Sequence, residues 1–212
     1  MTSAAFLLLA MTVAVAMTDW IAVARGWSVA EYVAKPLTMV MLIGVALSLN
    51  VASEAVRGAF VVALVASLVG DVFLMLPGER WFVFGLGAFL AGHLAYIVGL
   101  VMSGVAVPAL AVGLAVVALG GLVIGIRVVT AVRASDEPEM VGPVSAYIAV
   151  ISLMVVCAVG TRNPFAIGGA LLFYSSDALI AWNRFVRRHR WGDLVVMVTY
   201  HLGQIGLVLS LA

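Results

Sequence analysis

Two aspartates lie within long apolar runs, where an ionisable side chain is costly. No Lys or Arg lies within one helical turn of Asp71 or Asp177, so each must find a partner on another segment or stay protonated. A charged side chain at the centre of a membrane helix costs about 2.5–3.5 kcal/mol. Two carboxylates in different surroundings can act as general acid and general base, because one stays protonated while the other is ionised. Asp71 and Asp177 are therefore the candidate catalytic residues, with the two roles unassigned.

Other polar residues lie at helical spacing from these positions or from one another. Tyr174, for example, precedes Asp177 by three residues, a spacing that places both on one face of a helix. Asp19 is also consistent with an interfacial group that pairs with Arg25 or Lys35. We expect the whole set to form the supporting polar site; it comprises His93, Tyr96, Tyr174, Tyr200, Gln204 and Asp19. Within it, His93, Tyr96, Tyr200 and Gln204 are expected to position water and to orient the carboxylates.

Composition identifies the class of protein. Of the 212 residues, 65% are apolar and 10% are charged, whereas a soluble domain is about half apolar and about one quarter charged, so the chain is an integral membrane protein. A net charge of +1 argues against nucleic-acid binding driven by electrostatics. The single cysteine, Cys157, excludes an internal disulfide and a multi-cysteine metal centre. Because His pairs at metal-ligand spacing are also absent, we expect no metal and no cofactor.

Charged residues and turn formers divide the chain into eight apolar segments. A membrane-spanning helix needs about 20 residues, so the length accommodates eight helices with short loops. Long apolar runs without the alternation of barrel strands must be helical in lipid. We expect the first segment to be retained, because no Lys or Arg precedes it as in a signal peptide. The second segment is short unless the stretch from Glu31 to Lys35 joins it. The prediction is an all-α helical bundle forming a single transmembrane domain over residues 1–212, with spans at about 3–24, 36–51, 57–76, 82–104, 106–130, 142–160, 164–183 and 193–212.

The distribution of Lys and Arg predicts the orientation of the bundle. Nine of the eleven follow odd-numbered spans, and only Arg57 and Arg162 follow even-numbered ones. The basic loops are then cytoplasmic and both termini outside, in a multi-pass protein of the cell (inner or plasma) membrane. All five tryptophans fall at or beyond the cytoplasmic ends of the spans, as in an interfacial belt. The polar candidates all fall in the cytoplasmic half, which predicts one cavity open toward the inner leaflet or the cytoplasm.

The two halves of the chain share landmarks at an offset of about 107 residues. The matches are Asp71 with Asp177, Pro36 with Pro143, and His93 with His201. With four spans in each half, such a repeat is parallel, and it predicts that spans 3 and 4 face spans 7 and 8 across an axis along the membrane normal. Coincidence among common residues is the alternative, because the intervening side chains align poorly.

A series of short motifs runs from the second to the eighth span. They are Lys35-Pro36, Gly70-Asp71 before an apolar run, Phe84-Gly85-Leu86 through Phe89 to Gly92-His93 and Tyr96, Ser176-Asp177, and Tyr200 with Gln204. In this order and spacing the motifs resemble the YhhN-like lysoplasmalogenase family, which consists of small membrane proteins with eight predicted spans; His201 is not part of the resemblance. The resemblance implies hydrolysis of the vinyl-ether bond of lysoplasmalogens to a fatty aldehyde and a glycerophospho-base, with Asp71 and Asp177 as the candidate catalytic carboxylates.

The implied reaction suits the candidate residues. A vinyl ether is cleaved by protonation of its terminal carbon, after which water adds to the oxocarbenium ion and the hemiacetal collapses. The reaction needs an acid, a base and nearby negative charge, but no nucleophilic side chain. Lys35 and Arg184 are candidates for binding the substrate phosphate at the interface. The expected partners are the lysophospholipid substrate and membrane lipids; the headgroup and the oligomeric state stay open.

Two other function classes fit the same features. A proton-coupled carrier of lipids or small solutes would also have buried Asp and His residues and a half-repeat. Against a carrier, the polar candidates gather in one half of the membrane, whereas alternating access usually places its site near the midplane. An accessory subunit, in which polar residues only join helices together, is the third class.

Overall fold

The computed structural model describes residues 2–212, except for the side chain of Leu122. Within this range the secondary structure is helical, and eight helical segments are long and apolar enough to cross a membrane. Two of these segments contain a π-helical turn. The elements are α1 (Ser3–Arg25), α2 (Ser28–Ser48), α3 (Glu54–Met75), α4 (Glu79–Met102), α5 (Val107–Gly120), the π-turn η1 (Gly121–Gly125), α6 (Ile126–Arg133), the short 3-10 helix η2 (Pro138–Met140), α7 (Val141–Thr161), α8 (Pro164–Ala181), the π-turn η3 (Trp182–Val186) and α9 (Gly192–Leu209).

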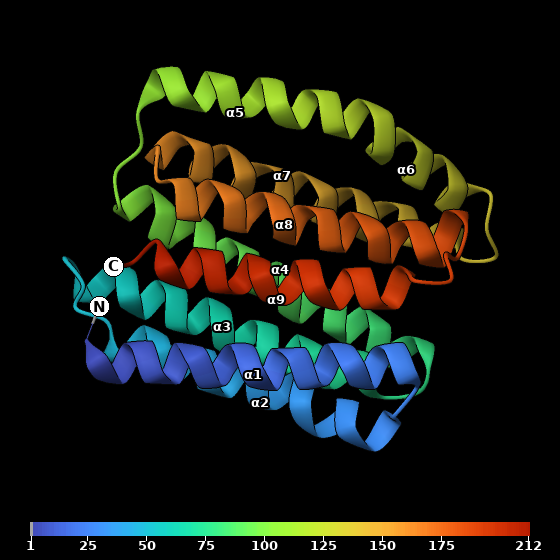
Figure 1. Ribbon diagram of the computed structural model, residues 1–212. Coiled ribbons are helices and arrows are strands. Elements are labelled where there is room, and N and C mark those ends of the chain that lie inside the picture. The colour runs from blue at the N-terminus through green and yellow to red at the C-terminus, as the bar shows by residue number, and fades with distance from the viewer. Residues whose placement is uncertain (1) are drawn as a thin grey trace.

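The helices form a bundle of antiparallel neighbours with both termini at one end (Figure 1). The closest pairs are α1 with α2, α3 with α4, and α8 with α9, while α4 meets α7 across the middle of the molecule. The continuous segment α5–η1–α6 lies along one side and packs mainly on α7. Helix α9 also contacts α1 and α2, so it links the first two helices to the last two.

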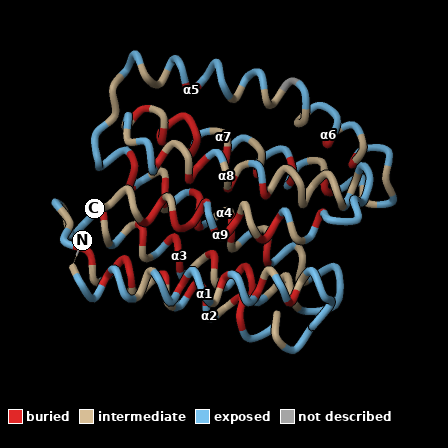
Figure 2. The backbone as a smooth tube through the Cα atoms, viewed as in Figure 1, coloured by how far each residue is buried: buried red, intermediate tan, exposed pale blue. Residues whose placement is uncertain are grey.

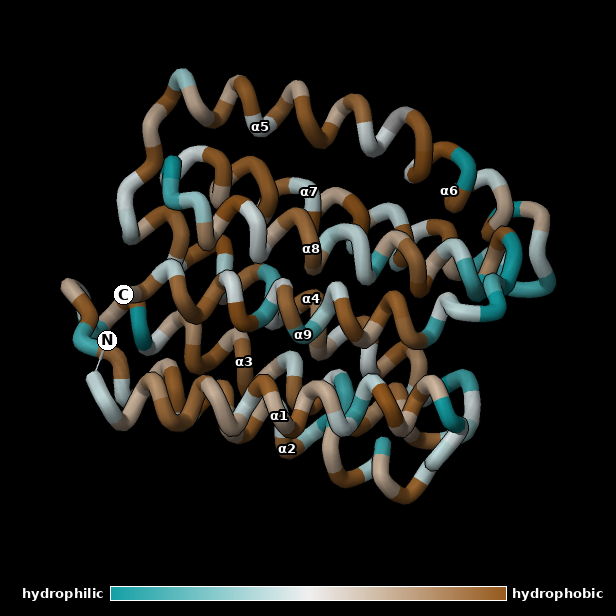
Figure 3. The backbone as a smooth tube through the Cα atoms, in the orientation of Figure 1, coloured by the Kyte–Doolittle hydropathy of each residue, from teal (hydrophilic) through white to brown (hydrophobic). Residues whose placement is uncertain are grey.

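The outer surface of the bundle is apolar, as lipid contact requires. Buried residues face the interior (Figure 2), whereas the outward sides of the helices remain largely hydrophobic (Figure 3). On α5, for example, Val107 is 77% exposed and Leu119 is 72% exposed. Isolated apolar side chains are normal on a soluble protein, but a whole helix of them is stable only against lipid or another apolar surface. The protein is therefore a multi-pass membrane protein.

The start predicted for the second span was wrong. The expected range began at Pro36, but α2 begins at Ser28 and carries Pro36 in its interior. Proline removes one backbone hydrogen bond, yet membrane helices tolerate it because neighbouring groups satisfy the freed carbonyl. The stretch from Glu31 to Lys35 is consequently helical, and its register turns Lys35 toward the interior, where it is 5% exposed.

Two side-chain contacts join the first half of the chain to the second half. Side chains of α3 and α4 meet side chains of α8 and α9: Asp71 contacts Tyr200, and His93 contacts Asp177. Asp71 of the first half thus contacts the Tyr200 side chain of the second half, and Asp177 of the second half contacts the His93 ring of the first half.

Candidate active site

Asp177, on α8, lies in a compact polar group with residues from α4 and α7. The Tyr147 hydroxyl donates a hydrogen bond of 2.6 Å to Asp177 Oδ2. His93 Nε2 lies 3.0 Å from the same oxygen and 2.9 Å from the Tyr147 hydroxyl. The three polar atoms therefore form a triangle through which one proton can be shared. Both contacts use Oδ2, and Asp177 Oδ1 has no hydrogen-bond partner within residues 2–212.

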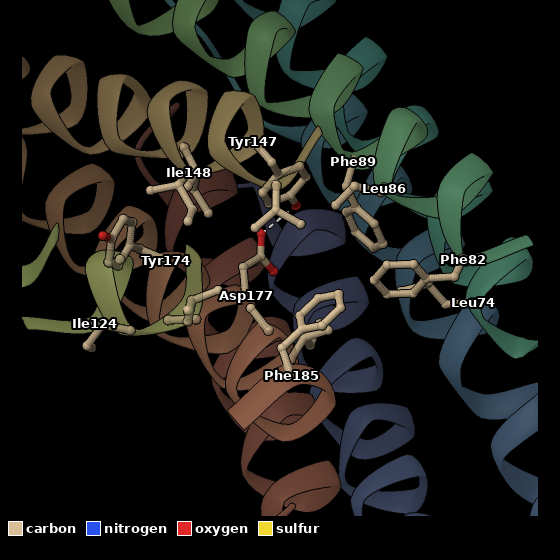
Figure 4. A pocket seen from close by; sticks show the side chains of 17 residues that line it. Leu74, Phe82, Leu86, Phe89, Ile124, Tyr147, Ile148, Tyr174, Asp177 and Phe185 are labelled. Atoms are coloured by element: carbon tan, nitrogen blue, oxygen red, sulfur yellow. Dashed lines mark hydrogen bonds between the residues drawn. The ribbon is translucent and has the colours of Figure 1, made fainter. Parts of the chain in front are cut away.

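An otherwise apolar cavity opens on this group (Figure 4). Asp177, Tyr147 and Tyr174 contribute its polar side chains. Its volume is about 70 Å³ for the centre of a water-sized sphere, several times the about 10–15 Å³ that one water needs. The cavity can therefore hold several water molecules beside Asp177. Its wall also includes Leu74, Phe82, Leu86, Phe89, Ile124, Gly125, Val128, Val144, Ile148, Ile151, Ala178, Ile180, Ala181 and Phe185.

Asp71, on α3, belongs to a second group that is buried in the bundle. Its Oδ1 lies 3.4 Å from Lys35 Nζ on α2, and its Oδ2 accepts a hydrogen bond of 2.6 Å from the Tyr200 hydroxyl on α9. As predicted, the partners of both aspartates come from other helices. Asp71 is 1% exposed and does not line the cavity, whereas the Asp177 side chain is 10% exposed. Lys35, expected at the interface, is instead an internal partner of Asp71.

Aromatic rings separate the two groups. The centroid of the Phe173 ring lies 4.7 Å from that of His93 and 5.3 Å from that of Tyr200. The Phe89 ring, which lines the cavity, lies 5.8 Å from Tyr200. The expected single polar cavity was therefore wrong: bulky rings fill the space between the carboxylates, and the cavity reaches only the group around Asp177.

The close approach of α8 and α9 depends on glycine and sets the position of Phe173. A Cβ added to Gly203 would lie 2.8 Å from the backbone nitrogen of Phe173 and 3.0 Å from the carbonyl oxygen of Gly169. Only glycine fits this contact without a backbone shift. This helix contact could not be predicted from the sequence, because the residues that flank Gly203 do not distinguish it from the other glycines of α8 and α9.

Two further polar contacts lie deeper in the bundle. Tyr96 donates a hydrogen bond of 2.5 Å to Gln204 Oε1, and both residues are fully buried. Trp20 Nε1 donates to His201 Nδ1 at 3.1 Å. Asp19 is fully buried, with its Oδ2 3.9 Å from His201 Nδ1, and it contacts neither of its two predicted partners.

The sequence missed Tyr147 and placed Tyr174 correctly on the face of Asp177. Tyr147 is the tyrosine of the sixth span, and it escaped selection because no Asp, His or Gln lies one turn away on its own helix. Its partners are 54 and 30 residues distant in the chain. The usable signal was its polar hydroxyl within an apolar span, which generally needs a hydrogen-bond partner.

Among the described residues, no group of three or more His, Cys, Asp or Glu is arranged to hold a metal.

Arg184, on η3, lies near the cytoplasmic end of α8 predicted from the sequence. Its Nη2 donates to both carboxylate oxygens of Glu137, at 2.8 and 2.9 Å. Its guanidinium carbon lies 3.9 Å from the centroid of the Phe82 ring, which belongs to the cavity wall. Arg184 is therefore held at one edge of the cavity.

Comparison with known proteins identifies relatives of this chain. The YhhN family model matches residues 30–211. The lysoplasmalogenase TMEM86B of Homo sapiens is 36% identical over 149 residues, covering 70% of this chain and 61% of the relative. A lysoplasmalogenase of Mycobacterium bovis is 37% identical over 128 residues, covering 58% of this chain and 49% of the relative.

The matched regions span between about half and under two thirds of the length of these curated relatives. No solved structure matches the chain. The family model covers helices α2 to α9, including every residue of the two carboxylate groups described above. On this evidence, the chain belongs to the YhhN family.

Proposed function

We propose that this protein hydrolyses the vinyl-ether bond of lysoplasmalogen-type lysophospholipids. The observation that carries the proposal is Asp177, hydrogen-bonded to Tyr147 and His93, at the wall of an apolar cavity. Relatives named lysoplasmalogenase support it. The products are a fatty aldehyde and a glycerophospho-base, and the whole reaction consumes one water.

The first step is a proton transfer to carbon. Asp177 donates the proton from Oδ1 to the vinyl carbon farther from the ether oxygen, and the electron pair of the double bond forms the new C–H bond. The adjacent carbon becomes an oxocarbenium ion, which the resulting Asp177 carboxylate stabilises by its negative charge. Tyr147 and His93 hold Oδ2, so that Oδ1 keeps its direction toward the cavity.

The second step is the addition of water. Asp177, now ionised, removes a proton from the water as its oxygen bonds to the cationic carbon, which restores the acid form. The hemiacetal then collapses: its hydroxyl proton leaves, the C–O bond to glycerol breaks, and the glycerol oxygen takes up a proton. Tyr147 and His93 lie within hydrogen-bond distance of Asp177 and can relay that proton.

Asp71 acts through its neighbours in this scheme. It holds Tyr200, whose ring packs on Phe173 and Phe89, and Phe89 forms part of the cavity wall. We therefore assign both proton transfers to Asp177 and give Asp71 a positioning role, in place of equal sharing by the two aspartates. Tyr96 and Gln204 stabilise the same region through their buried hydrogen bond.

The membrane setting fits a lipid substrate. The cavity wall is almost wholly apolar, which suits the long alkenyl chain of the substrate. We place the protein in the cell membrane, with its basic loops in the cytoplasm and both termini outside, on the distribution of Lys and Arg.

The test is incubation of the purified protein with a lysoplasmenylethanolamine, followed by mass spectrometry. The expected products are a fatty aldehyde and glycerophosphoethanolamine. The matched 1-alkyl lysolipid, which lacks the double bond that accepts the proton, should stay intact. Flux of lipid across proteoliposomes without breakdown would instead support the transporter, and neither flux nor hydrolysis would support the accessory role.

A further inference from the structure

A cleft of mixed charge adjoins the reaction cavity near η3. It is lined by Leu74, Leu76, Gly78, Glu79, Phe82 and Arg184. Leu74 and Phe82 also belong to the wall of the cavity, so the two spaces adjoin. The cleft therefore places one cationic and one anionic side chain beside an apolar chamber.

Arg184 is a pre-oriented donor in this cleft. Nη2 is fixed by both oxygens of Glu137, and the guanidinium lies over the Phe82 ring. Within residues 2–212, the hydrogen bonds of Arg184 use only Nη2, which leaves Nη1 and Nε as donors for a ligand. A planar guanidinium suits a phosphate because it presents paired donors at fixed geometry.

The rise along the helix from Asp177 to Arg184 is comparable to the length of a glycerophospholipid core. The residues are seven positions apart, and Arg184 lies on the π-turn η3 that continues α8, so the rise is a little less than the about 10 Å of seven α-helical residues. In a vinyl-ether lysolipid, seven bonds separate the phosphorus from the vinyl carbon that accepts the proton. An extended chain advances about 1.2 Å per bond, or about 8–9 Å in total. A substrate with its vinyl carbon at Asp177 thus reaches Arg184 with its phosphate.

We propose that this cleft binds the zwitterionic headgroup of the substrate, with the phosphate diester on Arg184 and the terminal ammonium beside Glu79. Four further bonds separate phosphorus from nitrogen in a phosphoethanolamine group, about 5 Å when extended. Glu79 and Arg184 line the same cleft, so one headgroup can contact both. The proposal rests on the proposed function, because it places the vinyl ether at Asp177.

The test compares KM for two vinyl-ether lysolipids in detergent micelles, one with an ethanolamine headgroup and one with a glycerol headgroup. Arg184→Gln should raise KM about 10-fold or more for both lipids with little change in kcat, because both carry the phosphate. Glu79→Gln should raise KM about 5-fold for the ethanolamine lipid alone. Equal effects of Glu79→Gln on the two lipids, or an unchanged KM in Arg184→Gln, would overturn the proposal.

Two control variants separate binding from structure. Glu137→Gln breaks the same ion pair but keeps the guanidinium, so KM should rise much less than in Arg184→Gln. A rise as large as that of Arg184→Gln would show that Arg184 serves only to hold Glu137. Arg187→Gln removes a neighbouring exposed arginine that does not line the cleft and should leave KM unchanged. A rise in Arg187→Gln equal to that of Arg184→Gln would indicate general surface charge.

A binding measurement keeps this proposal separable from the proposed function. A non-cleavable 1-alkyl lysophosphatidylethanolamine should bind wild-type protein, and Arg184→Gln should weaken that binding about 10-fold. Glycerophosphoethanolamine should compete, and inorganic phosphate at equal concentration should compete less, which distinguishes a headgroup from a free phosphate. If wild type binds this lipid through Arg184 but hydrolyses no vinyl ether, only the proposed reaction fails. Unchanged binding by Arg184→Gln contradicts the headgroup site.

Discussion

His93 Nε2 and Asp177 Oδ2 lie 3.0 Å apart although the residues are 84 positions apart in the chain. The contact joins α4 to α8, and Tyr147 on α7 closes the triangle. A polar contact between three helices at the wall of an apolar cavity is costly unless every member finds a partner. The two contacts hold the Asp177 carboxylate through Oδ2, whereas Oδ1 has no hydrogen-bond partner within residues 2–212. Asp177 also lines the cavity.

Removal of the Tyr147 hydroxyl tests whether the triangle serves catalysis. Tyr147→Phe keeps the ring, which packs edge-on against His93, but it removes the hydrogen bond to Asp177 Oδ2. We expect kcat for aldehyde release to fall about 10- to 100-fold, with a smaller change in KM.

The matched control for this change is Tyr32→Phe. The Tyr32 hydroxyl donates to the carbonyl oxygen of Met75, away from the cavity wall. Tyr32→Phe should retain wild-type kcat. Full activity in Tyr147→Phe would remove this tyrosine from the mechanism.

Lys35 and Asp71 should behave as a coupled pair in unfolding experiments. Both are buried, and Lys35→Met leaves the Asp71 carboxylate without its cation. Breaking a buried ion pair on one side costs about 3–5 kcal/mol. The double variant Lys35→Met with Asp71→Asn should recover much of that loss, because no unpaired charge remains. Thermal unfolding of the four proteins in one detergent gives the coupling, and strictly additive effects would argue against the pair.

Asp71→Asn also tests the division of roles between the two aspartates. We expect it to lower aldehyde release less than Asp177→Asn does, because Asp71 does not line the cavity and acts through Tyr200. An amide can still accept the Tyr200 hydrogen bond. Equal losses of activity in the two variants would indicate that both carboxylates take part directly in the reaction.

Gly203→Ala should disturb the packing that separates the two carboxylate groups. The added Cβ meets the backbone of Phe173 at 2.8 Å, so α8 and α9 must move apart. Overpacking of this kind costs about 1–3 kcal/mol, and aldehyde release should fall because Phe173 contacts the His93 ring. Gly58→Ala is the control, because nothing lies within 4 Å of its added Cβ. Equal unfolding temperatures for the two variants would contradict the close contact.

Sequence reasoning predicted the features that depend on local composition. Eight spans follow from apolar runs, and partners on other helices for Asp71 and Asp177 follow from the lack of a nearby Lys or Arg. The start of α2 was wrong because proline was taken as a helix start, although Pro36 lies inside α2. That error also placed Lys35 at the interface.

The rest of the site depends on contacts that no local pattern contains. Tyr147 meets Asp177 only because α7 packs beside α8 and α4. The prediction of a single polar cavity was wrong because Phe89 and Phe173 occupy the space between the carboxylate groups. Their positions depend on the rotation of each helix about its own axis, and His201 illustrates this: one residue beyond Tyr200, it faces Trp20 instead of Asp71.

The most direct measurement is aldehyde release from a lysoplasmenylethanolamine by purified wild-type protein and by Asp177→Asn, matched for folding by their thermal unfolding. Asparagine keeps the shape of the side chain but cannot donate and recover the proton. We predict a loss of about 100-fold or more in kcat for Asp177→Asn. Activity within about threefold of wild type would contradict the assignment of the reaction to Asp177.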